Sequence, residues 1–117
     1  MLKIEAIVRP ERISQVADAM LSAGCSGFHC QNVTGQGQQQ GVTVVTGRGA
    51  RVSNRSAVPK TLLTAVIPDN LKEAVIESII GAARTPDGGR IGDGKIFVSE
   101  VSDVVRVRTG EKGQDAI

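Results

Sequence analysis

The order of two hydrophobic patterns limits the fold of this chain more than any other feature. Residues 2–8 alternate apolar and polar side chains, which predicts a strand. Apolar residues then recur at helical spacing, and Pro10 and Gly24 suit the two ends of a helix over about 10–23. A strand followed directly by a helix therefore opens the chain.

The second half of the chain repeats this unit. A strand is predicted over 58–67, where Pro68 ends it, and a helix over about 71–84. Asn70 and Glu73 stand at the spacing of a capping box before that helix. Weaker patterns predict further strands over 25–34, 96–101 and 104–108.

Strand, helix, strand, strand, helix, strand is the order of a ferredoxin-like α+β fold. We expect a single domain over 1–117, in which four antiparallel strands carry two helices on one face. No spare element remains to cover the other face of the sheet. That face is therefore expected to meet other copies of the chain.

The segment over about 36–57 joins the two units. It is rich in glycine, glutamine, serine and arginine, and it contains little that could pack in a core. Arg48, Arg51 and Arg55 lie in it, and no acidic residue does. Loops of this length inside a compact domain are usually functional, so we expect a long, mobile, basic loop that meets a partner.

Composition argues against several classes of function. A net formal charge of +2 and only two aromatic residues do not suit a nucleic-acid-binding protein. Cys25, Cys30 and His29 match neither a disulfide framework nor the spacing of a zinc site. We find no apolar run that could cross a membrane and no signal peptide at the start, so a cytoplasmic protein is expected.

A glycine-rich loop over about 85–95 contains the sequence GGRIGDGK. Successive glycines can turn backbone N–H groups toward one point, which favours phosphate binding, and Lys95 would add a positive charge. An ordinary turn between a helix and a strand is the alternative explanation for these glycines.

Two weaker motifs accompany the glycine-rich loop. If 104–108 is a strand, Arg106 and Arg108 lie on one face, where a polyphosphate could sit between them. The alternative is a solvated edge strand. The sequence GQGQQQG over 35–41 would let a ligand approach the start of the long loop closely, although a flexible hairpin end has the same composition.

Together these motifs resemble the PII family of nitrogen-regulatory signal-transduction proteins. The resemblance is carried by IGDGKIFVS over 91–99, by VVRVRTGE over 104–111 and by MLKIEAIVRPE at the start of the chain. It implies a homotrimer that binds ATP or ADP in clefts between subunits and that is a regulator, not an enzyme. It further implies Mg²⁺ and 2-oxoglutarate as ligands that accompany ATP.

The resemblance also implies which residues form these sites. Gln39 would hold Mg²⁺ on the ATP phosphates, and Lys60 would pair with a carboxylate of 2-oxoglutarate. Contacts with the nucleotide are implied for Gly35, Gly37, Gln38, Gly92, Asp93, Gly94, Lys95, Arg106, Arg108 and, less directly, His29.

The chain departs from the family pattern in several places. Gln38 replaces an arginine that touches the phosphates in many members, Thr64 replaces a frequent acidic residue, and 86–88 form a short insertion in the glycine-rich loop. No tyrosine is present, so regulation by nucleotidylation of a loop tyrosine is excluded.

The expected function is control of a target protein, such as a transporter or an enzyme of nitrogen metabolism, through the long loop. The alternative is a PII-like sensor of a different small ligand that regulates another transporter or inorganic-carbon uptake. A slow ATPase that uses Asp93, and a nucleic-acid-binding protein that uses the basic loop, are weaker alternatives. We expect no direct insertion into a membrane.

Overall fold

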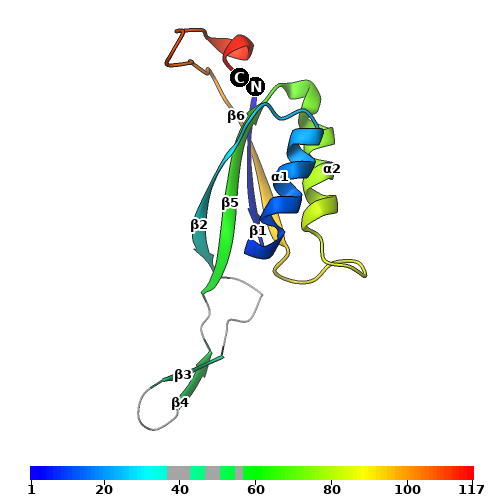
Figure 1. Ribbon diagram of the computed structural model, residues 1–117, viewed down its shortest axis with the longest axis vertical. Helices are drawn as coiled ribbons and strands as arrows, with labels where there is room; N and C mark the ends of the chain where they lie inside the picture. The colour runs from blue at the N-terminus through cyan, green and yellow to red at the C-terminus, as the bar shows by residue number, and fades with distance from the viewer. Residues whose placement is uncertain (37–42, 47–50, 55–56) are drawn as a thin grey trace.

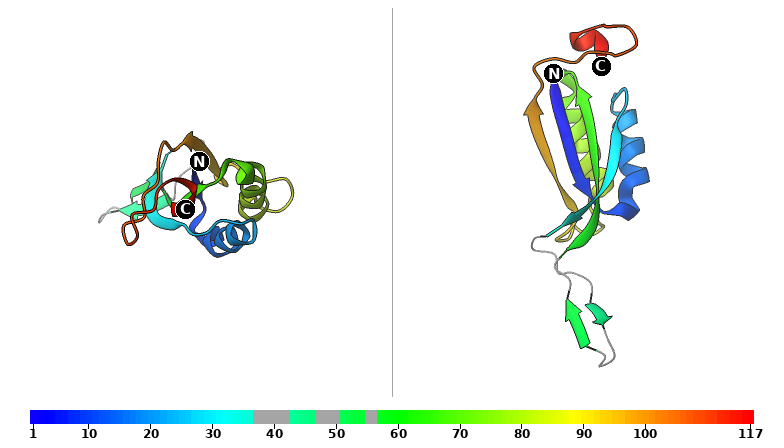
Figure 2. Two further views of the ribbon diagram at one scale, coloured as in Figure 1. Left: turned by 90° about the horizontal axis from the view of Figure 1, so that it is seen from above. Right: turned by 90° about the vertical axis from the view of Figure 1, so that its left-hand side faces the viewer.

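The computed structural model describes residues 1–36, 43–46, 51–54 and 57–117. Within this part of the chain one antiparallel sheet has the strand order β2-β5-β1-β6. Figure 1 shows both long helices side by side on one face of it, and Figure 2 shows the same layers from the side. The prediction of a ferredoxin-like α+β fold is confirmed. The bounds are β1 (Leu2–Val8), α1 (Ile13–Ser22), β2 (His29–Gly35), β5 (Val58–Ile67), α2 (Lys72–Ala83) and β6 (Gly94–Glu100).

Strand β1 lies in the middle of the sheet and fixes the register of its two neighbours. Its residues pair with β5 from Leu2 opposite Ile67 onward, and with β6 up to Val8 opposite Gly94. Because the strands are antiparallel, the chain that leaves β1 lies beside the chain that enters β6. The residues just outside this pair, Arg9 and Asp93, are therefore brought together by the sheet.

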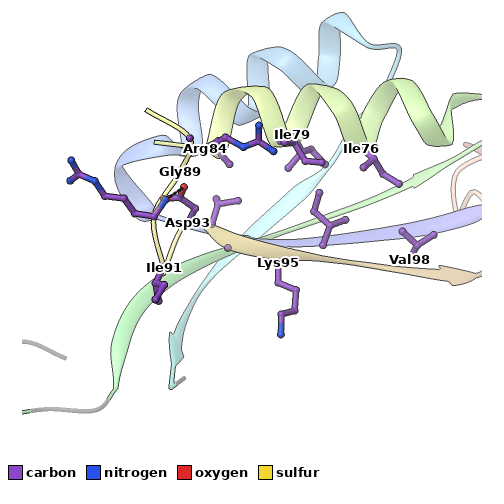
Figure 3. Close-up of a pocket in the computed structure, with 15 residues that line it drawn as sticks. Ile76, Ile79, Arg84, Gly89, Ile91, Asp93, Lys95 and Val98 are labelled. Carbon is purple, nitrogen blue, oxygen red and sulfur yellow. Dashed lines mark hydrogen bonds between the residues drawn. The ribbon is translucent and has the colours of Figure 1, made fainter. Parts of the chain in front are cut away.

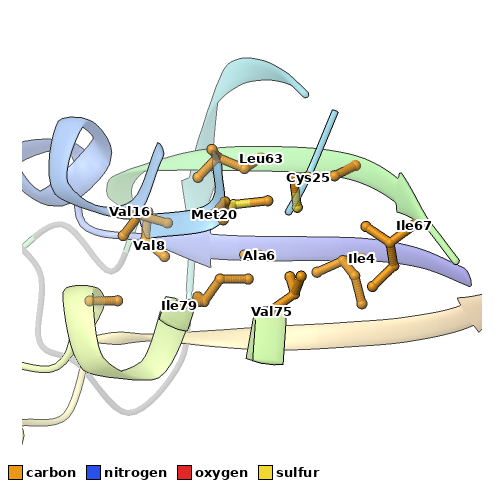
Figure 4. Packing of buried hydrophobic residues seen from close by; sticks show 12 residues of the cluster. Ile4, Ala6, Val8, Val16, Met20, Cys25, Leu63, Ile67, Val75 and Ile79 are labelled. Carbon is orange, nitrogen blue, oxygen red and sulfur yellow. The ribbon is translucent and has the colours of Figure 1, made fainter. Parts of the chain in front are cut away.

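The core lies between the sheet and the two helices. In β1, Ile4, Ala6 and Val8 are buried while the residues between them are more exposed, as expected for a strand that packs on one face. Figure 4 shows these side chains meeting residues of both helices. The buried apolar cluster consists of Ile4, Ala6, Val8, Val16, Met20, Cys25, Leu63, Ala65, Ile67, Val75, Ile79 and Ala83.

The opposite face of the sheet carries no helix in the described part of the chain (Figure 2). Strand β6 presents Phe97 there, opposite Glu5 of β1, and the Phe97 side chain is 49% exposed. A large apolar side chain left open on a sheet face is typical of a surface that another protein covers.

Both helices begin in a way that differs from the prediction. Short 3₁₀ turns, η1 (Pro10–Arg12) and η2 (Asp69–Leu71), precede α1 and α2, and no side chain caps either helix start. The capping box predicted from Asn70 and Glu73 is therefore wrong. The 3₁₀ turn replaces it, since the Leu71 N–H donates to the Pro68 carbonyl at 3.1 Å.

The long loop contains regular structure that the sequence analysis missed. Strands β3 (Thr43–Thr46) and β4 (Arg51–Asn54) form an antiparallel pair, which Figure 1 shows beyond the ends of β2 and β5. The β-branched sequence TVVT over 43–46 was the available signal. Gly37, Gln38 and Gln39 lie outside the described residues.

The strand predicted over 104–108 is not present. The segment 101–117, here called the C-terminal arm, folds back on itself through a single bridge between Val105 and Lys112 and ends in η3 (Gly113–Ala116). The arm is hydrogen-bonded to itself because the Gly113 N–H donates to the Val104 carbonyl at 2.9 Å. The strand predicted over 25–34 begins only at His29.

Truncation of a core residue tests this packing. Leu63→Ala removes a fully buried side chain and should lower the free energy of unfolding by about 2–5 kcal/mol, because the cavity cannot close completely. Leu21→Ala is the control, since Leu21 is 49% exposed and should cost less than about 1 kcal/mol. Urea denaturation measures both; equal losses would contradict the assignment of the core.

Candidate functional site

A cleft of about 600 Å³ lies where β1 ends and β6 begins, on the face of the sheet away from the helices. Several residues singled out in the sequence meet there, although they come from three parts of the chain. They are Gly35, Lys60, Gly92, Asp93, Gly94 and Lys95, and they are accompanied by Ile7, Gln36, Val58, Arg90, Ile91 and Phe97.

The Asp93 carboxylate organises the glycine-rich loop. Its Oδ2 accepts hydrogen bonds from the backbone N–H groups of Thr85 and Arg90, both at 2.9 Å, and from the Thr85 hydroxyl at 3.2 Å. Its Oδ1 accepts from Arg9 Nε at 3.0 Å, and Arg9 Nη2 also donates to the Ile91 carbonyl at 3.1 Å. One side chain thus joins the start of the loop, its middle and the exit of β1.

These hydrogen bonds decide the charge of Asp93. Burial on its own would raise the pKa of the carboxyl, but the hydrogen bonds from Arg90, Thr85 and Arg9 outweigh burial and hold the pKa far below its usual range. Asp93 is therefore an anion that Arg9 already neutralises. Both carboxylate oxygens have partners, Oδ2 within the loop and Oδ1 at Arg9, so the side chain supports the site from inside rather than facing a ligand.

Lys60 connects the middle of the sheet to the same loop. Its side chain is buried, although the residue is polar, and its amino group donates to the Gly92 carbonyl. Burial lowers the pKa of Lys60, and so does the nearby charge of Arg9, whereas Glu11 and Asp93 act in the opposite direction. Lys60, Lys95 and Arg90 make the cleft basic, because Asp93 is the one acidic residue among the described residues that line it and is already paired.

Gly94 shows why the loop must return to the sheet through a glycine. Its φ is 132°, and a Cβ at this position would lie 2.0 Å from the carbonyl oxygen of Ile7. No larger residue fits that approach without a shift of the backbone. The close passage of β6 against β1 is therefore specified by this residue.

His29 lies away from the cleft within one chain. It pairs with Thr64, whereas Lys60 pairs with Val33, so the two are four residues apart along β5, or about 13 Å at the usual rise per residue. His29 lines a separate shallow depression of about 270 Å³, together with Gly27, Phe28, Thr64, Ala65 and Val66.

The two arginines lie still farther from the glycine-rich loop. They belong to the C-terminal arm, which begins after the far end of β6, about 20 Å from Gly94 at the usual rise per residue (Figure 1). Arg106 pairs with Glu111 at 2.9 Å, and Arg108 is exposed in a turn. The expectation that a strand holds both on one face is wrong, because the chain turns at 107–109.

Sequence reasoning missed Arg9 and Thr85, which complete the hydrogen bonding of Asp93. Thr85 belongs to no recognisable motif, and Arg9 lies in the opening sequence MLKIEAIVRPE, which gave no indication of its role. The only signal that could have found Arg9 is the pairing of β1 with β6, since that register places the end of one strand beside the start of the other.

The structure offers little to metal or thiol chemistry. Over the described ranges, no group of three His, Cys, Asp or Glu side chains could hold a metal ion. Cys25 is buried, which raises the pKa of its thiol, and Cys30 is exposed; both are free.

In the described part of the chain no helix has the length and hydrophobicity that a membrane span needs.

Gly94→Ala should destabilise the protein by more than about 2 kcal/mol, because the new methyl group would collide with the Ile7 carbonyl and the backbone conformation is unfavourable for alanine. Gly81→Ala in α2 is the matched control. A Cβ at Gly81 meets nothing within 4 Å, so helix propensity should stabilise that variant by up to about 1 kcal/mol. Thermal unfolding distinguishes the two; a neutral Gly94→Ala would show that β6 approaches β1 less closely.

The stability of the protein should depend on pH through Asp93. A carboxyl with a lowered folded pKa contributes stability above its unfolded pKa of about 4, and this contribution is lost as the pH falls below that value. Asp93→Asn should therefore be less stable than the wild type at pH 7 and should lose less stability on acidification. Urea titrations at pH 7 and pH 3 measure this, with the exposed Asp18→Asn as control. Parallel curves for Asp93→Asn and wild type would contradict the proposed hydrogen bonding.

Comparison with known proteins shows relatives along the whole chain. Residues 1–111 match the family described as "Nitrogen regulatory protein P-II". The chain is 43% identical to the P-II protein 2 of Methanothermobacter thermautotrophicus, covering 100% of this chain and 97% of the relative. It is 43% identical to the P-II protein of Rhodobacter capsulatus over the full length of both.

Solved structures agree with these sequence matches. A crystal structure of Arabidopsis thaliana PII bound to citrate superposes with a TM-score of 0.76 and 43% identity, covering 99% of this chain and 91% of that one. The similarity spans the sheet, both helices and the glycine-rich loop, and the family is one of regulators rather than enzymes. The chain therefore belongs to the PII family of nitrogen-regulatory signal-transduction proteins.

Proposed function

We propose that this protein binds ATP and ADP at the Asp93-organised cleft, and that the site is completed by a second copy of the chain in a homotrimer. The observation that carries the proposal is the cleft itself. Its lining side chains are cationic at Lys60, Lys95 and Arg90, and its one carboxylate is already paired with Arg9. A basic cleft next to a glycine-rich turn suits a polyphosphate.

The distances within one chain support a site between two copies. Arg106 and Arg108 lie beyond one end of β6, and the glycine-rich loop lies at the other, so one chain cannot bring them to the same phosphates (Figure 1). His29 is likewise remote from the loop. The uncovered sheet face with Phe97 offers the surface through which copies would meet.

Arg106 would have to change partner on binding a nucleotide. It is paired with Glu111 within its own arm, and both side chains are more than one-third exposed. An exposed pair of this kind contributes little stability, so a phosphate with a higher charge can replace the carboxylate. The C-terminal arm would then be ordered against the neighbouring cleft.

A carboxylate effector is proposed to act beside the nucleotide. Lys60 would pair with 2-oxoglutarate, since it is a cation of the cleft and an ammonium group suits a carboxylate. Mg²⁺ would be held by the ATP phosphates and by Gln39, because both oxygens of Asp93 already have partners. The citrate bound to the Arabidopsis relative is also a polycarboxylate, which supports this class of effector.

The bound ligands would change the base of the long loop at Gly35 and, beyond the described residues, at Gly37 and Gln38. We propose that the loop then binds or releases a transporter or an enzyme of nitrogen metabolism. The alternative, a sensor of another small ligand that controls a different transporter or inorganic-carbon uptake, is favoured by the unusual loop sequence and the absence of tyrosine. The expected cytoplasmic location stays a prediction.

Calorimetry decides between the two functions. The purified protein is titrated with ATP, with ATP plus Mg²⁺ and 2-oxoglutarate, with ADP, with AMP derivatives and with bicarbonate. Tight binding of ATP and ADP by a trimer supports the nitrogen-regulatory function. A monomer that binds no adenine nucleotide would overturn the proposal, and a response to bicarbonate or AMP derivatives alone would favour the alternative.

Arg106→Ala should weaken ATP and ADP binding about ten- to a hundredfold, since charge-assisted hydrogen bonds contribute about 1.5–3 kcal/mol each. The trimer should persist. Lys112→Ala is the control, because it removes an exposed cation from the same arm and should leave affinity within about twofold. Unchanged affinity in Arg106→Ala would reject its assignment to the phosphates.

A further inference from the structure

A second cavity, of about 660 Å³, lies on the helix-bearing side of β6 (Figure 3). We call it the α2–β6 groove. Apolar residues form its walls: Ile76, Ile79, Ile80 and Ala83 from α2, with Val8, Ile96 and Val98 from the sheet. The groove and the cleft described above share loop residues between Arg90 and Lys95, but they lie on different faces of β6, where Ile96 and Val98 line the groove and Phe97 lines the cleft. Figure 3 shows Lys95 pointing away from Ile76 and Ile79.

The groove is open because β6 is the last strand of the sheet. Strand β6 pairs only with β1 in the described part of the chain, and α2 does not reach across its outer edge. Ile80 remains 38% exposed and Val98 39% exposed as a result. Both line the groove, whose volume is of a size typical of small-molecule sites.

The insertion in the glycine-rich loop closes one end of this groove. Three successive residues with positive φ, Asp87 at 66°, Gly88 at 90° and Gly89 at 89°, turn the chain back toward α2. Gly89 then packs on Arg84, so that a Cβ there would lie 3.1 Å from Arg84 Cγ. The insertion, which the nucleotide site does not use, is thereby part of the groove wall.

The closed end is positively charged. Figure 3 shows the Arg84 side chain extending from the end of α2 toward Ile79, along the groove. Arg84 forms no ion pair with any described residue. The one acidic residue in the lining, Asp93, has its charge balanced by Arg9. Arg90, which also lines the groove, likewise has no ion pair among the described residues. An apolar channel with unbalanced guanidinium groups at its end is complementary to an anion with an apolar tail.

We propose that the α2–β6 groove binds a medium-chain aliphatic carboxylate, with the carboxylate on Arg84 and the chain between α2 and β6. The length agrees, since Gly94 to Val98 spans about 13 Å of strand. A carboxylate suits the planar guanidinium, and its chain would cover the exposed surfaces of Ile80 and Val98. The apolar walls of the site, formed by α2 and by Ile96 and Val98 of β6, lie outside the nucleotide cleft, although the two spaces share loop residues between Arg90 and Lys95.

The test compares decanoate with decanol, each titrated by calorimetry below the concentration at which it aggregates. The full chain should bind decanoate about tenfold more tightly than decanol, because only the acid can pair with Arg84. Arg84→Gln should abolish this difference while leaving decanol affinity unchanged. Ile80→Glu should weaken both ligands at least tenfold, because it places a carboxylate in the apolar wall.

Two control variants match these changes outside the groove. Lys72→Gln removes an exposed cation from the start of α2, and Leu21→Glu adds an acid at an exposed apolar position of α1. Both should bind decanoate and decanol as the wild type does. Ile80 and Arg84 are exposed, so their variants should retain the wild-type melting temperature, which is checked in parallel.

Four outcomes would overturn the proposal. If decanoate binds no better than decanol, Arg84 does not hold the carboxylate, and if Ile80→Glu leaves binding intact, the groove is not the site. If instead decanoate fails to bind and Ile80→Glu changes the oligomeric state, the groove is covered by a second copy of the chain. Competition with ATP would place decanoate in the nucleotide cleft, whereas ATP affinity unaffected by saturating decanoate supports two separate sites.

Discussion

The hydrogen bonds of the Asp93 carboxylate connect the fold of this protein to its proposed function. The pairing of β1 with β6 brings Arg9 beside Asp93, and Asp93 then fixes the backbone at Thr85 and Arg90. A loop with several glycines would otherwise sample many conformations. Because an ionised carboxylate replaces water as the acceptor for these donors, the loop is ordered before any ligand arrives, and the entropy cost of binding is reduced.

Strand β6 lines two different surfaces because its side chains point alternately to the two faces of the sheet. Lys95 and Phe97 face the cleft and the uncovered side of the sheet, whereas Ile96 and Val98 face the α2–β6 groove. The glycine-rich loop before β6 likewise contributes residues to both the cleft and the groove. Gly92 lines the cleft, Gly88 of the inserted residues lines the groove, and Gly94 lines both.

Hydrophobic periodicity predicted the fold well because burial in this sheet is mostly one-sided, as the alternation in β1 and β5 shows; Lys60, which is buried on the cleft side, is the exception in β5. The glycine-rich loop was also predicted, since only glycine permits the conformation at Gly94. Arg9 could not be predicted, because its role depends on strand register rather than on local sequence. The C-terminal arm was predicted as a strand since its valines and arginines alternate, but no strand among the described residues pairs with 104–108 and the arm bonds to itself.

The central claim is that the cleft of one copy is completed by the C-terminal arm of another, and mixed trimers test it most directly. A cleft variant, Lys95→Ala, and an arm variant, Arg106→Ala with Arg108→Ala, are unfolded together in equal amounts and refolded. Random assembly should restore tight ATP binding in about one quarter of the clefts, those with an intact loop beside an intact arm. If the mixture binds ATP no better than the two variants refolded separately, the arm does not complete a neighbour's cleft and the account is wrong.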